Sequence, residues 1–228
     1  MINFLSRGRL GKPSRPANVP MDPQLKVLSQ WQSERLAHTY SDLLASSHFG
    51  TACRFFLSDL YGPYDFSQRD QDIRQVQHSM HRFLPARILH SLNLVIELQD
   101  LTISLDQKLL EVLVDELGMT DTITTELYAE GYRRCGNYEE RKRQIALIVE
   151  VGQELDQLVH MPITSATLRM TGRPARLAGW SKLHNFLERG FDAFKTMDSA
   201  ETFLHIIDQR ERQILANIFK GNPEPFNL

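Results

Sequence analysis

The segment from 85 to 117 most constrains the fold, because its pattern predicts one long, uninterrupted helix. Apolar residues recur along it at three- and four-residue spacings, at Leu94, Leu98, Leu101, Leu105 and Val112. A polar stripe on the opposite side consists of Asn93, Glu97, Asp100, Ser104, Gln107, Glu111 and Asp115. A helix of this length spans roughly 50 Å at 1.5 Å per residue. We therefore expect a long central helix that packs on a helical bundle.

The rest of the chain has the same helical period, and no stretch alternates apolar and polar residues as a strand would. Glycine and proline divide it, as at Gly62-Pro63, because glycine tolerates the left-handed end of a helix and proline cannot continue one. The pattern predicts helices at 23–48, 50–61, 67–84, 86–117, 121–135, 138–160, 164–171, 174–195 and 199–220. We expect an all-α fold, a single-domain bundle of about seven to nine helices over residues 22–228.

Composition excludes several classes of partner. Hydrophobic residues make up 42% of the chain and charged residues 24%, and the formal net charge is −2, so no overall positive field attracts nucleic acid. No apolar run approaches the roughly 18 residues of a membrane-spanning helix, so we expect no membrane association. The two cysteines, Cys53 and Cys135, follow neither CxxC nor zinc spacing. They indicate reduced thiols and a cytoplasmic location.

Residues 1–21 differ from the rest of the chain. The first twenty hold three prolines, no acid and four basic residues, at Arg7, Arg9, Lys12 and Arg15. Their apolar stretch at 2–5 is too short for the core of a signal peptide. We expect a disordered basic tail, and the alternative is a basic arm that touches a partner or an anionic surface.

A dense apolar cluster stands just before Gly62-Pro63. It reads FFLSDLY over 55–61, continues as GPYDFSQRD, and contains no catalytic signature, so we interpret it as buried structure. Further blocks read RQIALIVEVGQELDQL, LRMTGRPARLAGWSKLHNFLERGFDAF and FLHIIDQRE. On these blocks the chain resembles the bacterial FFLEELY motif proteins, although Ser58 and Asp59 replace two glutamates of the motif. The resemblance implies a bacterial origin and an all-helical fold, and it supplies no catalytic residues.

Common catalytic and metal-binding signatures are missing from the sequence. It has no Glu-x-x-His pair of the kind that di-iron bundles use, no HExxH, no GxSxG and no glycine-rich phosphate loop. Glu201 and His205, four residues apart, point away from the apolar stripe of their helix, and His78 lies opposite the stripe of its own. We therefore expect no metal and no cofactor, and we assign no catalytic residue.

Five residues interrupt or flank apolar helix stripes and form a candidate ligand or interface site: Arg176, Trp180, His184, Arg210 and Glu211. Glu211 falls near the centre of the apolar face of the last helix, with Arg210 at its edge. A buried charge is costly unless it is paired, so three alternatives stand: a network with Arg176, a polar site at a subunit seam, or an outward rotation that exposes both. His184 is either a hydrogen-bonded core residue or a ligand contact beside Trp180.

Two arginine clusters stand out in the sequence. Arg169, Arg173 and Arg176 surround Gly172-Pro174 at a predicted helix start, where free backbone N–H groups attract anions, so Arg169 and Arg173 are candidate anion-binding residues; ordinary surface arginines beside a cap are the alternative. The second cluster contains glutamates as well, which predicts a solvated charged turn formed by Arg133, Arg134, Glu139, Glu140, Arg141, Lys142 and Arg143.

These observations favour an interaction or regulatory module without its own catalysis, whose partner is a second copy of the chain or another protein. Apolar excess around 174–195 would extend into such an interface. The alternative is a small-molecule-binding or cofactor-dependent helical-bundle enzyme with a site near Trp180, His184, Arg210 and Glu211. A polar cavity of about 300 Å³ or more would favour the alternative, and a flat apolar patch would favour the module.

The composition of residues 1–20 generates a first prediction. Because they lack a core-forming pattern, their deletion should leave the melting temperature within a few degrees of that of the full chain. Thermal unfolding followed by circular dichroism measures this. A large drop would show that the segment is part of the folded core.

Overall fold

The long helix is present in the computed structural model as α5 (Ala86–Glu111), which continues as a π-helix, η2 (Val112–Glu116). The wider turn is seen in the bond from the N–H of Leu117 to the carbonyl of Val112, five residues back, at 3.1 Å. Leucines of the predicted apolar stripe are buried or half-buried, and every residue of the predicted polar stripe is exposed. The expected central helix and its orientation are therefore confirmed.

The structure describes residues 22–60, 73–75, 86–161, 168, 170, 172–173, 179, 181–197 and 199–228. The other helices in these ranges are α1 (Pro23–Thr39), α2 (Ser41–Ala45), α3 (Gly50–Phe55), the π-helix η1 (Phe56–Leu60), α6 (Thr125–Cys135), α7 (Tyr138–Val159), α9 (Ser181–Lys195) and α10 (Glu201–Phe219). The described elements are all helical and pack as one domain, which confirms the all-α fold. The expectations for 1–21, and for nearly all of 67–84 and 164–171, fall outside the described residues.

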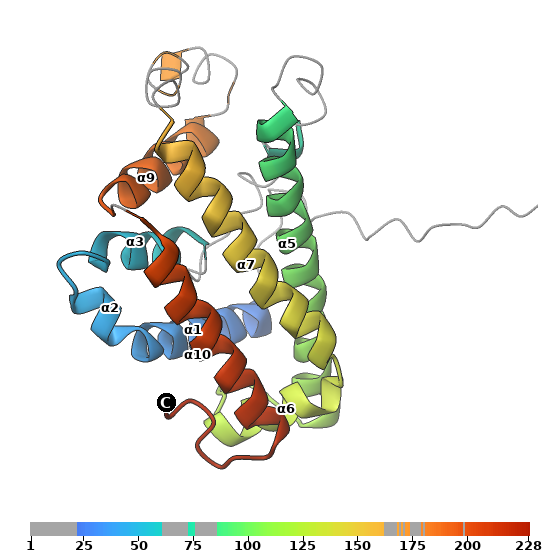
Figure 1. Ribbon diagram of the computed structural model, residues 1–228. Coiled ribbons are helices and arrows are strands. Elements are labelled where there is room, and N and C mark those ends of the chain that lie inside the picture. The colour runs from blue at the N-terminus through green and yellow to red at the C-terminus, as the bar shows by residue number, and fades with distance from the viewer. Residues whose placement is uncertain are drawn as a thin grey trace, which may run out of the picture.

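Three long helices lie side by side, with α7 between α5 and α10 (Figure 1). The helices pack tightly at Gly152 of α7, where a Cβ atom would lie only 2.4 Å from the Cδ2 atom of Leu204 on α10. A larger residue there would require the Leu204 side chain to move. The shorter α6 closes one end of this layer against α10 and η2, and α9 packs on α7 and α3.

The predicted helix over 23–48 is wrong, because the chain breaks at Tyr40 into α1 and α2. Tyr40 is only 4% exposed, and its hydroxyl donates a hydrogen bond to α10. After α2, the hydroxyl oxygen of Ser46 accepts hydrogen bonds from the N–H groups of His48 and Phe49, and this turn leads into α3. Local helix propensity was therefore overridden by a tertiary contact of one side chain.

Residues 55–60 of the FFLSDLY run form the end of α3 and all of η1, and Tyr61 lies outside the described residues. Phe55 is buried and lies over Gly190 of α9, where a Cβ atom would come within 2.8 Å of the ring. Phe56 is half-buried and meets the ring of Phe203 edge-on, with centroids 6.1 Å apart. The carboxylate of Asp59 accepts hydrogen bonds from Arg189, which ties η1 to α9. The described part of the run is thus core and interhelical contact, as interpreted from the sequence.

Neither cysteine forms a disulfide. Cys53 is buried and Cys135 is half-buried. Burial raises the pKa of the Cys53 thiol to about 11, so it stays protonated and unreactive near neutral pH. Within the described ranges, no helix is long and apolar enough to cross a membrane.

The burial of Phe55 generates a prediction about stability. Phe55→Ala should lower the free energy of unfolding by about 3–5 kcal/mol, because it removes a buried ring and leaves a cavity against α9. Phe56→Ala, on a half-buried neighbour, is the matched control and should cost less. Urea denaturation measures both. A loss below about 1 kcal/mol at Phe55 would contradict its place in the core.

Candidate functional site

Glu211 of α10 meets Arg35 of α1 in a largely buried ion pair. One carboxylate oxygen of Glu211 lies 2.7 Å from the Nη1 atom of Arg35 and 2.9 Å from the hydroxyl of Tyr40. Only 13% of the Arg35 side chain and 15% of the Glu211 side chain are exposed. The charge that the sequence places on the apolar face of α10 is therefore compensated from α1.

Arg35 and Tyr40 both keep their protons beside Glu211. Burial by itself lowers the pKa of Arg35, but the attraction and hydrogen bond of Glu211, together with the nearby Tyr128 and Tyr40, outweigh it, so the pKa lies above its usual value. Burial, together with the neighbouring Glu211 charge, raises the pKa of Tyr40. The phenol therefore stays protonated and donates a hydrogen bond to the carboxylate. Two strong donors occupy one oxygen of Glu211, which suits a structural brace better than a proton-transfer group.

Arg210 forms a second brace, closer to the surface. Its Nη1 atom donates to the carbonyl of Thr39 at 2.8 Å, and its two terminal nitrogens bind the carboxylate of Asp42 at 2.7 Å each. Hydrogen bonding from Arg210 lowers the pKa of Asp42 to about 2. The Asp42 side chain is 57% exposed, so solvent screens this pair. The two braces together join α10 to α1 and α2.

The other predicted site residues are elsewhere or undescribed. Arg176, Trp180 and Arg169 lie outside the described residues, and Arg173 is exposed. His184 is 5% exposed; its Nε2–H donates to the carbonyl of Leu168 at 2.9 Å, and its Nδ1 atom lies 3.4 Å from Glu188. Its observed contacts are those of a hydrogen-bonded core histidine on α9. The partners that the structure gives Arg210 and Glu211 come from α1, from α2 and from Tyr40 between them.

An open hollow lies along α1, beside these braces. The last residues of the chain turn back along α10 toward α1 (Figure 1) and divide the hollow into two clefts of about 640 and 560 Å³. The clefts share His38, Phe226 and Asn227 as lining residues. We call the larger one the aromatic cleft; its lining residues are Trp31, Glu34, Arg35 and His38 of α1, Thr125 and Glu126 of α6, and Pro223, Glu224, Phe226 and Asn227.

Stacked rings form the inner wall of the aromatic cleft. The ring of Trp31 lies 4.0 Å from that of buried Tyr128, nearly parallel to it, and meets Phe226 edge-on at 5.7 Å. The guanidinium of Arg35 lies 5.7 Å from the centroid of Phe226. Sequence reasoning missed these groups. The available signal was the spacing of Leu28, Trp31 and Arg35, which lie on one face of α1.

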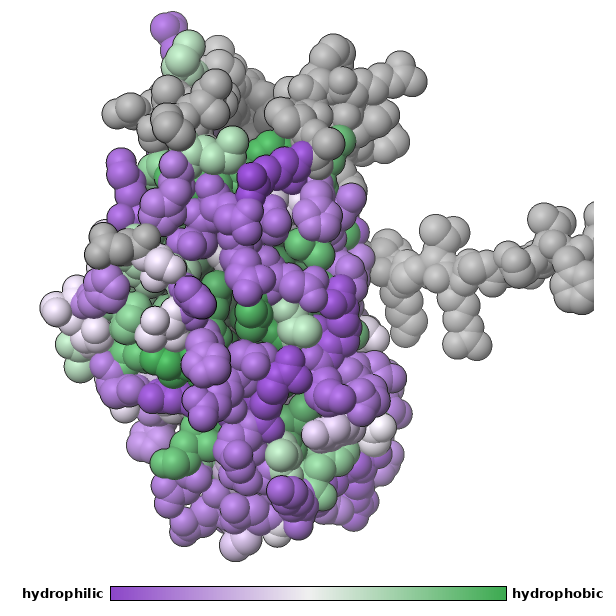
Figure 2. Space-filling model, in the orientation of Figure 1, coloured by the Kyte–Doolittle hydropathy of each residue, from purple (hydrophilic) through white to green (hydrophobic). Residues whose placement is uncertain are grey.

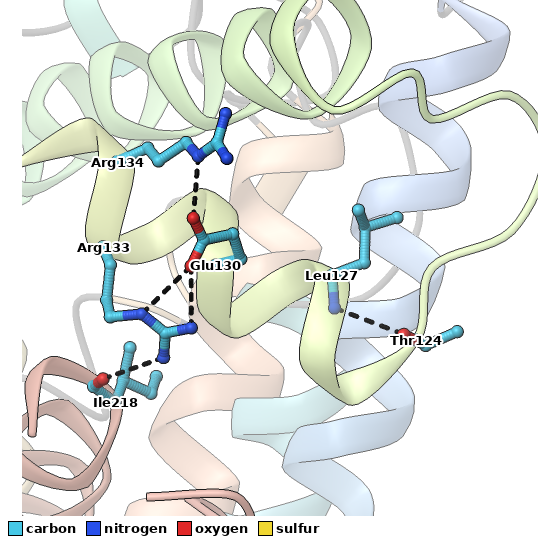
Figure 3. Close-up of polar contacts among 6 residues, drawn as sticks. All are labelled: Thr124, Leu127, Glu130, Arg133, Arg134 and Ile218. Atoms are coloured by element: carbon cyan, nitrogen blue, oxygen red, sulfur yellow. Dashed lines mark hydrogen bonds and ion pairs between the residues drawn. The ribbon is translucent and has the colours of Figure 1, made fainter. Parts of the chain in front are cut away.

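Polar contacts of α6 hold the outer wall in position (Figure 3). The hydroxyl of Thr124 accepts from the N–H of Leu127 at 3.2 Å and caps the helix whose first residues border the cleft. At the other end of α6, Glu130 accepts hydrogen bonds from Arg133 and Arg134. Arg133 also donates to the carbonyl of Ile218 at 3.2 Å, which ties α6 to the end of α10 where the C-terminal segment begins.

A second buried polar network corrects the prediction of a solvated charged turn at Arg141. This residue is 3% exposed, and its guanidinium lies 4.3 Å from the ring centroid of Tyr132. It donates to the carbonyl of Leu105 and to Gln144, at 3.3 and 3.1 Å. Asp106 lies 3.8 Å away; burial raises the pKa of this carboxyl. Because Gln32 of α1 donates to Asp106 at 3.1 Å, the network joins α1, α5, α6 and α7.

Within the described ranges no three histidine, cysteine or acidic side chains gather in a way that suits a metal ion. The model of the family described as a domain of unknown function (DUF8198) matches residues 13–225 of the chain. No curated protein matches the chain, and no solved structure does. The matched range includes every helix bordering the aromatic cleft.

The two braces should differ in how much their charge pairs contribute to stability. Arg35→Met or Glu211→Gln should each destabilise the fold by about 3–5 kcal/mol, because either change leaves a charge buried without its partner. Their double-mutant cycle should give a coupling above about 1 kcal/mol. The matched control is the exposed pair Arg210→Met and Asp42→Asn, where coupling should be at most about 1 kcal/mol. Chemical denaturation measures both cycles, and additive effects at Arg35 and Glu211 would refute the brace.

Proposed function

We propose that this chain, which belongs to the DUF8198 family, is a binding module that holds a positively charged protein segment in the aromatic cleft. The observation that carries the proposal is the charge of the cleft. The cleft has an acidic rim, and the arginine within it already has an acidic partner. The carboxylates of the rim therefore lack a cationic partner, and a ligand with a positively charged side chain would supply one.

The rim consists of three exposed carboxylates, at Glu34, Glu126 and Glu224. Glu34 and Glu224 accept hydrogen bonds from the neutral amides of Gln30 and Asn227, and no ion pair reaches any of the three within the described part of the chain. Hydrogen bonds from its own N–H and from a threonine hydroxyl lower the pKa of Glu126, so it remains ionised. Uncompensated carboxylates around a hollow attract cations and speed their association.

The aromatic wall supplies the second half of the recognition. A lysine or arginine side chain combines a positive head with an apolar stem, and it binds well where carboxylates flank the face of a tryptophan. Trp31 is half-buried at this wall, so its ring is held in place by Tyr128 while part of it still borders the cleft. The two clefts are open and adjoin at His38, Phe226 and Asn227, so together they can receive an extended protein segment.

The alternative of a small-molecule or cofactor site keeps one supporting observation, since both clefts exceed about 300 Å³. They are open rather than enclosed, and the carboxylate of Glu211 beneath them is engaged by Arg35 and Tyr40. A binding role without catalysis therefore has the better support.

We also propose that the chain is related to the bacterial FFLEELY motif proteins and lies in the cytoplasm, as the sequence led us to expect. Self-association, the third such expectation, has less support. For self-association through a broad apolar face, Figure 2 offers little support on the side it shows, where apolar surface is broken into separate patches among hydrophilic side chains. Among the described residues of α9, Leu187 is the one large apolar residue that is exposed. The partner we favour is accordingly a basic segment rather than an apolar surface.

Binding of a basic peptide tests the proposal. The probe is a synthetic peptide of roughly twelve residues that repeats Arg-Pro-Ser, and its control repeats Glu-Pro-Ser. In a Trp180→Phe background, the fluorescence of Trp31 should change on titration with the basic peptide alone. Substituting Glu34, Glu126 and Glu224 by Gln together should weaken binding by about tenfold.

A matched variant controls for net charge. It carries Glu111→Gln, Asp115→Asn and Glu140→Gln, three exposed positions that line neither cleft. This variant should bind the probe as the unmodified chain does, apart from a small effect of overall charge. Equal weakening in both variants, or no binding at all, would contradict a specific cationic site in the aromatic cleft.

A further inference from the structure

The sequence just before α1 matches what the aromatic cleft lacks. Between Lys12 and Pro20 it reads KPSRPANVP, with two basic residues, three prolines and no acid. We propose that this segment docks in the aromatic cleft of its own chain and thereby competes with other basic partners. The inference rests on the proposed function, since it assigns an occupant and a form of regulation to the same cleft.

The segment is long enough to reach the cleft. Asp22 caps α1, and its carboxylate accepts from the N–H of Gln24 at 2.8 Å, so the start of the helix is well defined. Trp31 lies nine residues further, or about 14 Å along the helix axis. Arg15 lies seven residues before Asp22 and reaches about 22 Å in an extended proline-type conformation. A chain that folds back at the start of α1 therefore brings Arg15 alongside Trp31.

Its composition suits an aromatic, acidic groove. Proline fixes φ near the extended range, so a proline-rich segment loses little conformational entropy when it binds. Such segments typically bind grooves lined by aromatic rings. The two positive side chains would lie near the rim carboxylates of Glu34, Glu126 and Glu224, with one stem against Trp31. Both the charge and the shape of the cleft are then complemented by the chain itself.

The contact would regulate rather than stabilise. Exposed charge pairs contribute little to folding and are screened by salt, so docking is compatible with the small effect of deletion predicted above. A segment tethered next to its site nevertheless has an effective concentration in the millimolar range. An outside basic partner must displace the segment. The apparent affinity of the cleft for that partner is then the intrinsic affinity multiplied by the fraction of time that the cleft is free.

The test compares full-length chains that differ only in this segment. In the Trp180→Phe background, the chain that carries Lys12→Gln and Arg15→Gln should bind the Arg-Pro-Ser probe about fivefold more tightly than the chain with the unmodified segment does. The matched control is Lys108→Gln with Lys195→Gln, which removes two exposed cations from α5 and α9 and should leave affinity nearly unchanged. Equal affinity with and without Lys12 and Arg15 would overturn the inference while leaving the proposed function standing.

Zero-length cross-linking gives an independent readout. Carbodiimide should join the amine of Lys12 to Glu34, Glu126 or Glu224 within one chain, and high salt should abolish the product. Mass spectrometry of a mixture of isotope-labelled and unlabelled protein distinguishes links within a chain from links between copies. Links found only between copies, or no link to these three residues, would overturn docking within the chain. Failure of the probe to bind any of the chains would overturn the proposed function itself.

Discussion

The ion pair between Arg35 and Glu211 is the interaction on which the cleft and its surroundings depend. It joins α1 to α10, near the two ends of the sequence, and the hydroxyl of Tyr40 shares the same carboxylate oxygen. Two charges removed from water gain little net stability unless both are well bonded, and an unpaired one would be costly. Their geometry therefore specifies how α1 crosses α10. This crossing sets the course of the break at Tyr40, the position of α2 and the wall against which the C-terminal segment lies.

The network around Arg141 acts in a similar way where α1 meets α5, α6 and α7. Apolar packing among α5, α7 and α10 is compatible with small shifts of one helix along another, because hydrophobic contact has no direction. Hydrogen bonds from Arg141 to a carbonyl of α5, and from Gln32 of α1 to Asp106, allow only one alignment. We interpret both networks as devices that select a single arrangement of helices, and the aromatic cleft lies where α1, α6 and the C-terminal segment are so arranged.

Much of the architecture could be predicted from periodicity, because helices depend on neighbours in sequence. The stripe on α5 and the burial of Phe55 followed from the spacing of apolar side chains. The prediction failed at Tyr40, where a bond to a residue far along the chain ended a helix that local propensity would have continued. It also failed at Arg141, whose neighbours in sequence are charged and exposed while its neighbours in space are Tyr132 and a carbonyl of α5.

The sequence by itself determined the fold class, the long helix and the anomaly of two charges on the apolar face of α10. These features depend on composition and on spacing within one helix, both of which can be read along the chain. Only the tertiary structure decided that Glu211 pairs with Arg35 rather than with a residue near 176–184, and that Trp31, Glu126 and Phe226 border one cleft. The physical reason is that a helix face shows that a side chain needs a partner but not which distant helix supplies it. That choice depends on the crossing of α1 and α10, to which burial, hydrogen bonding and packing of the whole bundle contribute at once.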